Sequence, residues 1–169
     1  MKQIIYYLCA VLILVSCTPP VDNSASEAFE KNSKTVLANL QGWQNENLDY
    51  SMYADDFAMM ETGFSSENDS VSLTEMIETD KKLWQTYDFK MLNEPVLLPG
   101  VNATTKAVDG SVRHYSQWEI TLSATDSTEA KSGVIKMYES FDFNEEGKIR
   151  YQQVYADFTG IMMHLHGQE

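Results

Sequence analysis

Two acidic side chains and a histidine are the residues of this chain whose types and positions first suggest chemistry. Glu139, Asp157 and His114 each stand in a segment where apolar and polar residues alternate, as in a strand with one buried face. On such a face, desolvation would raise the pKa of a carboxyl group toward the range that suits a general base. We therefore take Asp157, helped by His114, as the candidate catalytic residues of a small-molecule site.

A tight turn predicts which residues of the last two strands face each other. Asn144-Glu145-Glu146-Gly147 suits a type I turn whose glycine takes a positive φ, so that Phe143 faces Ile149. Cross-strand partners share a face of the sheet, and counting outward therefore places Glu139 and Asp157 on one face. That face, which the helices should cover, also receives Ile135, Met137, Phe141, Phe143, Ile149, Tyr151 and Tyr155, whereas the solvated face receives Lys136, Tyr138, Asp142, Lys148, Arg150 and Gln152.

The preceding strand alternates in the same way over 112–122. Its more apolar set contains His114 and Trp118, which we expect to face the same way as Glu139 and Asp157. An apolar pocket with a few convergent polar groups is the usual form of a small-molecule site. The residues predicted to line such a pocket are Tyr53, Trp84, His114, Trp118, Glu139, Tyr155 and Asp157.

The same candidates also have structural interpretations. Asp157 stands just before a segment, 159–165, that suits a terminal helix, and an acid at that position caps the first turn. Glu139 suits a buried acid bonded to Gln153 or to a tyrosine, and His114 suits a half-buried strand residue. The sequence leaves these alternatives open.

Two helices precede the strands, and both carry start signals. Ser24-Ala25-Ser26-Glu27 has the spacing of a capping box, and apolar residues then recur at helical intervals as far as Trp43. Ser72-Leu73-Thr74-Glu75 repeats the signal before a second periodic run that reaches Tyr87. We expect a short helix at 47–53, and strands at 57–61, 112–122, 134–143 and 149–158. Helices packed on a mostly antiparallel sheet make an α+β fold.

Four features occur in a set order: YADDF at 53–57, a helix ending in Trp84, a strand with Trp118, and FDFNEEGKIRYQQVYAD at 141–157. In order and spacing they resemble the SnoaL-like branch of the nuclear transport factor 2-like superfamily, over residues 27–166. The resemblance implies a cone, in which a curved sheet wraps against three helices around a pocket. In the cyclases and isomerases of this superfamily an acid inside the cone moves a proton next to a carbonyl. Asp157 matches the last-strand acid of the cyclases.

Three functions remain open, because one fold hosts many activities. A role in binding a small apolar ligand, or a structural role, is favoured, because we find no convincing pair of donors for an oxyanion. An enzyme of the isomerase or cyclase type, without a metal, would use Asp157 and His114. An assembly module would form a homodimer through the open sheet face, which the predicted Lys136 and Arg150 make polar.

The N-terminus predicts export and attachment to a membrane. Lys2 precedes an apolar run of about 12 residues, which is too short to span a bilayer and suits a signal peptide. The tetrad Leu14-Val15-Ser16-Cys17 then resembles the lipobox of bacterial lipoproteins, in which the peptide is cut before the cysteine and the thiol carries diacylglycerol. This implies a signal peptide at 1–16, a lipid-attached linker at 17–26, and no free thiol for a disulfide or a zinc site. An uncleaved secretory signal is the alternative.

The charge of the chain limits its partners. The formal net charge is −13, and removal of residues 1–16 makes it −14, because Lys2 is lost and no acid is. So acidic a surface repels phosphate backbones, and we do not expect nucleic acid as a partner. We also expect no metal and no cofactor. His164 and His166 would point about 200° apart on a helix and could not share an ion. Thr18 follows Cys17 where an inner-membrane retention signal would have Asp, so the cell envelope, and the outer membrane rather than the inner, is the expected location.

Overall fold

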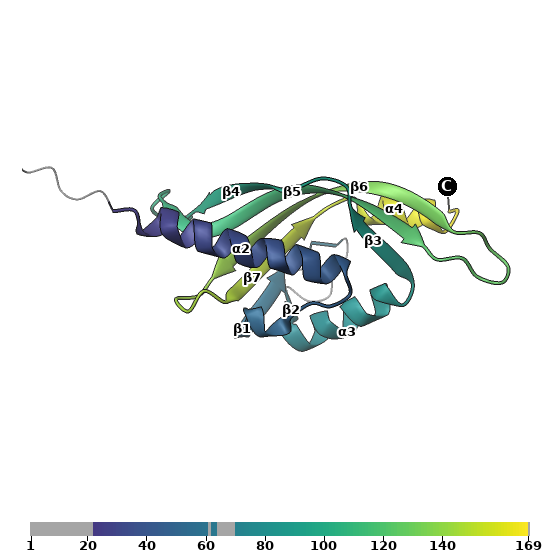
Figure 1. The fold of residues 1–169 in the computed structure, drawn as a ribbon, viewed down its shortest axis with the longest axis horizontal. Coiled ribbons are helices and arrows are strands. Elements are labelled where there is room, and N and C mark those ends of the chain that lie inside the picture. Colours follow the sequence, from purple (N-terminus) through teal and green to yellow (C-terminus); the bar gives the residue numbers. More distant parts are fainter. Residues whose placement is uncertain (1–21, 61, 64–69, 169) are drawn as a thin grey trace, which may run out of the picture.

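The structure is a computed structural model, which describes residues 22–60, 62–63 and 70–168. The predicted signal peptide and the predicted lipid-attachment residue Cys17 lie outside the described residues. The elements of the described part are α2 (Ser24–Gln44), the 3-10 helix η1 (Tyr50–Met52), β1 (Tyr53–Met60), β2 (Ser70–Ser72), α3 (Leu73–Trp84), β3 (Tyr87–Met91), β4 (Val96–Val101), β5 (Val108–Leu122), β6 (Lys131–Phe143), β7 (Ile149–Tyr155) and α4 (Phe158–Leu165) (Figure 1).

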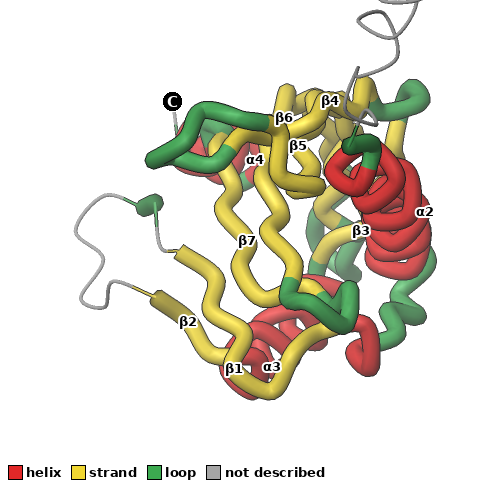
Figure 2. Tube along the Cα trace, turned by 90° about the vertical axis from the view of Figure 1, so that its left-hand side faces the viewer, coloured by secondary structure: helices red, strands yellow, loops and turns green. Residues whose placement is uncertain are grey.

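The strands form one curved sheet in the order β2-β1-β7-β6-β5-β3, and β4 also pairs with β5. All pairs are antiparallel except β1 with β7, which is parallel. Figure 2 shows the strands arranged in an arc, with α2 and α3 across its open side. The α+β prediction and the cone-like arrangement are therefore confirmed, although β2, β3 and β4 were not predicted from the sequence.

The two long helices begin differently. The predicted capping box at Ser24 is absent, because α2 begins at that residue and its N-cap, Asn23, forms no side-chain cap bond. Helix α3 begins as predicted: the Ser72 hydroxyl accepts from the backbone N–H of Glu75, and the carboxylate of Glu75 accepts from the backbone N–H of Ser72. Helix α3 ends at Trp84, as in the features of the family resemblance, and Tyr87, which the periodic run also included, is the first residue of β3.

The turn between β6 and β7 has the predicted form, but the register beyond it does not. Gly147 has φ 81°, and its N–H donates to the carbonyl of Asn144. Phe143 pairs with Ile149, but Asp142 then pairs with Tyr151, so Arg150 is an extra residue in β7. Such a bulge shifts all later pairs by one residue and exchanges the two faces.

The bulge makes part of the predicted register wrong. Tyr155 pairs with Tyr138 on the outer face, and Tyr151 shares that face with Asp142. Gln152 pairs with Phe141 and is buried, although the sequence placed it on the solvated side. We call the face toward α2 and α3 the inner face and the opposite one the outer face.

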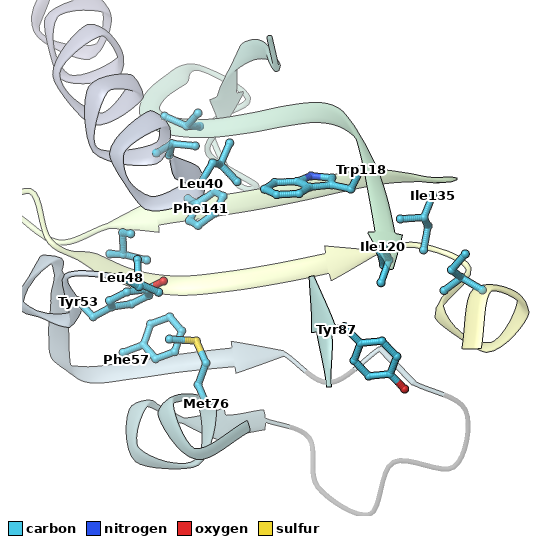
Figure 3. Close-up of a cluster of buried hydrophobic side chains, with 14 of the residues drawn as sticks. Leu40, Leu48, Tyr53, Phe57, Met76, Tyr87, Trp118, Ile120, Ile135 and Phe141 are labelled. Carbon is cyan, nitrogen blue, oxygen red and sulfur yellow. The ribbon is translucent and has the colours of Figure 1, made fainter. Parts of the chain in front are cut away.

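The hydrophobic core lies between the inner face and the helices. Figure 3 shows Trp118 and Phe141 near the end of α2, and the side chain of Met76, from α3, reaching toward Phe57 of β1. On β5 every second residue from Val112 to Ile120 is buried, while the residues between them are partly or fully exposed, which confirms the predicted alternation.

Candidate functional site

A cavity of about 300 Å³ lies within this core, and we call it the inner cavity. It is bordered by the inner face of β5, β6 and β7, by α2 and α3, by the end of β1 and by α4, and it is partly open to solvent. Its volume is at the lower end of the range for small-molecule pockets, and about twice that of a cavity that holds benzene. Apolar side chains make up most of the wall, among them Leu40, Trp43, Met59, Met76, Leu83, Phe89, Trp118, Ile120, Met137, Val154, Phe158 and Met162.

Four buried polar side chains interrupt this apolar wall, each from a different element. Asn39 belongs to α2, Asp80 to α3, Glu139 to β6 and Gln152 to β7. Burial of a polar group is unfavourable unless it is hydrogen-bonded, so the partners of these four determine what each can do.

Glu139 is the centre of a buried hydrogen-bonded group on the inner face. Its Oε2 lies 3.2 Å from Nε2 of His114, the residue directly opposite on β5. The imidazole tautomer with its proton on Nε2 donates to this oxygen, and Nε2 of Gln152 donates to it at 3.5 Å. The imidazole of His114 also stacks on Phe141, with ring centroids 5.8 Å apart. The carboxylate is therefore held by two donors and contributes to the cavity wall.

Asp80 is a second buried acid, on the α3 side of the cavity. Its Oδ1 accepts from the indole N–H of Trp43 at 3.2 Å, and its Oδ2 accepts from the hydroxyl of Tyr50 at 2.9 Å. Burial raises the pKa of Asp80 above its ordinary value of 3.8, and the two hydrogen bonds only partly oppose this effect. The same environment raises the pKa of Tyr50, through its own burial and the nearby Asp80.

The predicted pocket residues divide into those that line the inner cavity and those that stand behind its wall. Trp118 and Glu139 line it. His114 is fully buried and reaches the cavity wall through Glu139. Tyr53 is buried too, and its hydroxyl accepts from the amide of the wall residue Asn39, while burial raises its pKa. Trp84 is half-buried, with its ring centroid 6.2 Å from that of Trp43.

Two of the predicted pocket residues lie away from the inner cavity. Tyr155 is 49% exposed on the outer face, because the bulge at Arg150 reverses its orientation. Asp157 follows the end of β7, is exposed, and caps α4 by accepting from the backbone N–H of Gly160 at 2.9 Å. The geometry thus matches the alternative interpretation of Asp157, as a helix cap.

Asp80, Asn39 and Gln152 were missed by the sequence reasoning. A signal for Asp80 exists: it stands four residues after Met76 and three before Leu83, so it lies on the apolar stripe of α3. An acid on such a stripe is a candidate site residue. Gln152 was assigned to the solvated face by the register count, and no local feature marks the bulge that turns it inward.

The two histidines near the C-terminus, His164 and His166, have different partners. Nε2 of His164 lies 3.2 Å from the carbonyl of Ser132, whereas Nε2 of His166 lies 2.7 Å from the hydroxyl of Tyr87. Within the described residues, no three His, Cys, Asp or Glu side chains are arranged to hold a metal ion. No helix of the described part is long and apolar enough to cross a membrane.

Comparisons with known proteins agree on the fold. No family model matches the sequence, and no curated protein matches it either. Among solved structures, an NTF2-like protein from Burkholderia xenovorans LB400 is similar with a TM-score of 0.59 and 10% identity, over 80% of this chain and 96% of that one. A protein assigned as a SnoaL-like polyketide cyclase from Shewanella denitrificans OS-217 has a TM-score of 0.54 and 10% identity, over 82% and 98%.

A third solved structure, BvnE pinacolase from Penicillium brevicompactum, has a TM-score of 0.61 and 14% identity, over 91% of this chain and 97% of that one. Each likeness covers nearly the whole neighbouring chain, so the described elements make up a complete cone. The domain therefore has the nuclear transport factor 2-like fold.

Proposed function

We propose that this domain binds a small, mostly apolar organic molecule in the inner cavity. The observation that carries the proposal is an open volume of about 300 Å³ inside the core. Protein interiors normally pack as densely as organic crystals, because the atoms around a void lose their dispersion contacts. A partly open pocket of this size, with apolar walls and four buried polar side chains, has the usual form of a small-molecule site and is better explained as a binding site than as a packing fault.

Two of the structural neighbours described above carry the names of enzymes, a polyketide cyclase and a pinacolase. Their shared cone agrees with an interior that receives an organic molecule, although the residues of this chain decide which molecule enters.

Native mass spectrometry tests the binding proposal. Residues 18–169, incubated with an extract of the source cells, should gain a mass of a few hundred daltons. Met137→Trp, which fills the cavity from β6, should lose this adduct, whereas Val134→Trp, on the exposed side of the same strand, should keep it. The absence of an adduct from the unchanged chain, or its persistence in Met137→Trp, would contradict binding at this site.

We also propose that a lipid on Cys17 attaches the domain to a membrane of the cell envelope, with the outer membrane favoured. The support is the sequence Leu14-Val15-Ser16-Cys17 after an apolar run. Labelled palmitate should enter the full-length chain in its source cells and should not enter Cys17→Ser. Equal labelling of both chains, or labelling of neither, would argue against the tether.

A proton-transfer enzyme is the second candidate, and the buried pair of Glu139 and His114 is the observation that favours it. In such an enzyme, Glu139 would be the general base that takes a proton from a carbon beside the carbonyl of the substrate, and His114 would orient the Glu139 carboxylate. Asp157 has no part in it, because its side chain caps α4 outside the inner cavity.

Deuterium uptake separates this enzyme from a simple binder. The ligand recovered from the protein should gain deuterium on carbon when it is incubated with the chain in D₂O. Glu139→Gln should bind this ligand and fail to exchange it, whereas Asp157→Asn should exchange it normally. If the unchanged chain promotes no exchange, the domain is a binder without this activity.

A further inference from the structure

We propose that the ligand of the inner cavity is a protonated amine: a compact apolar body that carries one ammonium group. This inference rests on the binding function proposed above and names the class of its ligand. It follows from three properties of the wall, namely its hydrogen-bonding inventory, its charge and its aromatic rings.

The wall uses most of its side-chain donors within the protein. The indole N–H groups of Trp43 and Trp118 donate to Asp80 and to a serine hydroxyl, respectively. The amide nitrogens of Asn39 and Gln152 also donate to protein atoms, and the hydroxyl of Thr62 donates to a backbone carbonyl. Among the described lining residues, the side-chain donors left for a ligand are the hydroxyl of Thr79 and the second N–H of the Gln152 amide, and a ligand that needs more would have to displace existing hydrogen bonds.

The acceptors of the wall are less fully used. An ionised carboxylate offers about four lone-pair sites. Asp80 accepts two described hydrogen bonds, while Glu139 accepts from Gln152 and lies within bonding distance of His114. In addition, Oε1 of Gln152 is buried and has no hydrogen-bond partner among the described residues. Because its Nε2 faces Glu139, this amide presents an acceptor on its other side. The wall therefore suits a ligand that donates.

The charge of the wall indicates which kind of hydrogen-bond-donating ligand fits best. The described lining residues include the carboxyl groups of Asp80 and Glu139 and no Lys, Arg or His. Glu139 has His114 behind it, but the partners of Asp80 are the neutral side chains of Trp43 and Tyr50. An ionised Asp80 is thus a buried charge without a cationic partner, which is unfavourable. An ammonium group supplies that partner, and an anionic ligand would be repelled.

Aromatic rings around the cavity favour a cation further. Trp43 packs at large angles against two other wall residues, with ring centroids 4.2 Å from Phe89 and 5.8 Å from Trp118. The face of an aromatic ring attracts a cation through its quadrupole, and tryptophan does so most strongly. The volume of the inner cavity, about twice that which holds benzene, leaves room for a bicyclic or cage-like body beside the charged group.

Three probes with one body and different head groups test the assignment: 1-adamantylamine, 1-adamantanol and 1-adamantanecarboxylate. Their affinities for residues 18–169 would be measured by isothermal titration calorimetry near pH 7. We expect the amine to bind about tenfold more tightly than the alcohol, and the carboxylate to bind most weakly.

Two variants of α3 place this preference on Asp80. Asp80→Asn should reduce the affinity for the amine to that for the alcohol and leave the alcohol unaffected. The matched control Glu78→Gln removes one negative charge from an exposed position of the same helix, and it should keep the full preference. The comparison of head groups in the unchanged chain decides the matter even if Asp80→Asn does not fold.

The outcomes separate the amine assignment from the binding function. An alcohol or carboxylate that binds as tightly as the amine, or an adduct from the cell extract without a basic nitrogen, would overturn the assignment and leave the binding function standing. If no probe binds and no adduct forms, both proposals fail.

Discussion

Whether a side chain of the sheet is buried depends more on the face on which it lies than on its own polarity, because the helices cover the inner face and leave the outer face open. His114 is polar and 0% exposed, whereas its neighbour Tyr115 on the outer face is 52% exposed. Both stand on β5, one residue apart, and the helices that cover the inner face make the difference. On the inner face a polar group must therefore find a partner, and such partnered groups are where chemistry or binding can arise.

Pairs of polar side chains show the same contrast. On the outer side, Arg150 lies 2.8 Å from Asp56, and both side chains are more than half exposed. Water competes for such a pair, and it contributes little to stability. On the inner face, the pair of His114 and Glu139 is shielded from water and cannot be replaced by solvation. The contrast between the faces can be tested in five ways.

Truncation of an aromatic residue on each face should give the largest difference. Trp118→Ala leaves a void beside the inner cavity and should lower the free energy of unfolding by about 3–5 kcal/mol. Tyr115→Ala, three residues earlier on the outer face, should change it by about 0.5 kcal/mol or less. Urea denaturation measures both, and equal losses would show that the outer face is covered by something in solution.

Removal of an acid from each face should give the next largest difference. Glu139→Ala deprives His114 and Gln152 of their shared acceptor and should cost about 1–3 kcal/mol of unfolding free energy. Glu119→Ala, which removes an acid from the outer face of β5, should have almost no effect in the same urea assay. A neutral result for Glu139→Ala would mean that water takes over the role of the carboxylate.

The pH dependence of stability tests the burial of Asp80. Its pKa is raised in the folded state above the ordinary value of 3.8, so over that interval the folded state binds more protons than the unfolded state. The contribution of Asp80 to stability is thus complete below the ordinary pKa and is lost as the pH rises through the raised one. The free energy of unfolding of Asp80→Asn relative to that of the unchanged chain, measured in urea, should rise between about pH 4 and pH 7, and a difference that stays constant over this range would contradict the burial of Asp80.

The exposed ion pair on the outer side should contribute little to stability. Arg150→Gln removes the partner of Asp56 and should lower the free energy of unfolding by about 0–1 kcal/mol. In 1 M salt the difference should vanish, because the charges are screened. A loss above this range that persists in salt would show that Arg150 stabilises the bulge in β7 by contacts other than charge.

A measurement of self-association tests whether the outer face forms an interface between two copies of the chain. Tyr115, Tyr138 and Tyr155 form a row there, with ring centroids 5.1 and 6.4 Å apart, so this face is more aromatic than the predicted Lys136 and Arg150 suggested. If the homodimer predicted from the sequence forms, sedimentation equilibrium should show it, and Tyr155→Glu should weaken it without loss of stability. A chain that is monomeric at high concentration would rule the homodimer out.

Local patterns were sufficient for much of the fold. The alternation of β5 predicted which of its residues are buried, Ser72 and Glu75 predicted the start of α3, and Asn144 to Gly147 predicted the turn. These features depend on residues within a few positions of one another, so they are readable before the chain folds. The sequence by itself also determined the order of the helices and of the four strands that it predicted, and with it the resemblance to the cone fold.

The candidate site depended on contacts that no local pattern contains. One extra residue at Arg150 turned Gln152 toward Glu139 and moved Tyr155 outward, because a shift of one residue exchanges the faces of a strand. Asp80 meets Trp43 and Tyr50 only because α3 packs across the open side of the sheet, near α2 and η1. The sequence thus determined which side chains can be buried, and the tertiary structure decided which of them share one cavity.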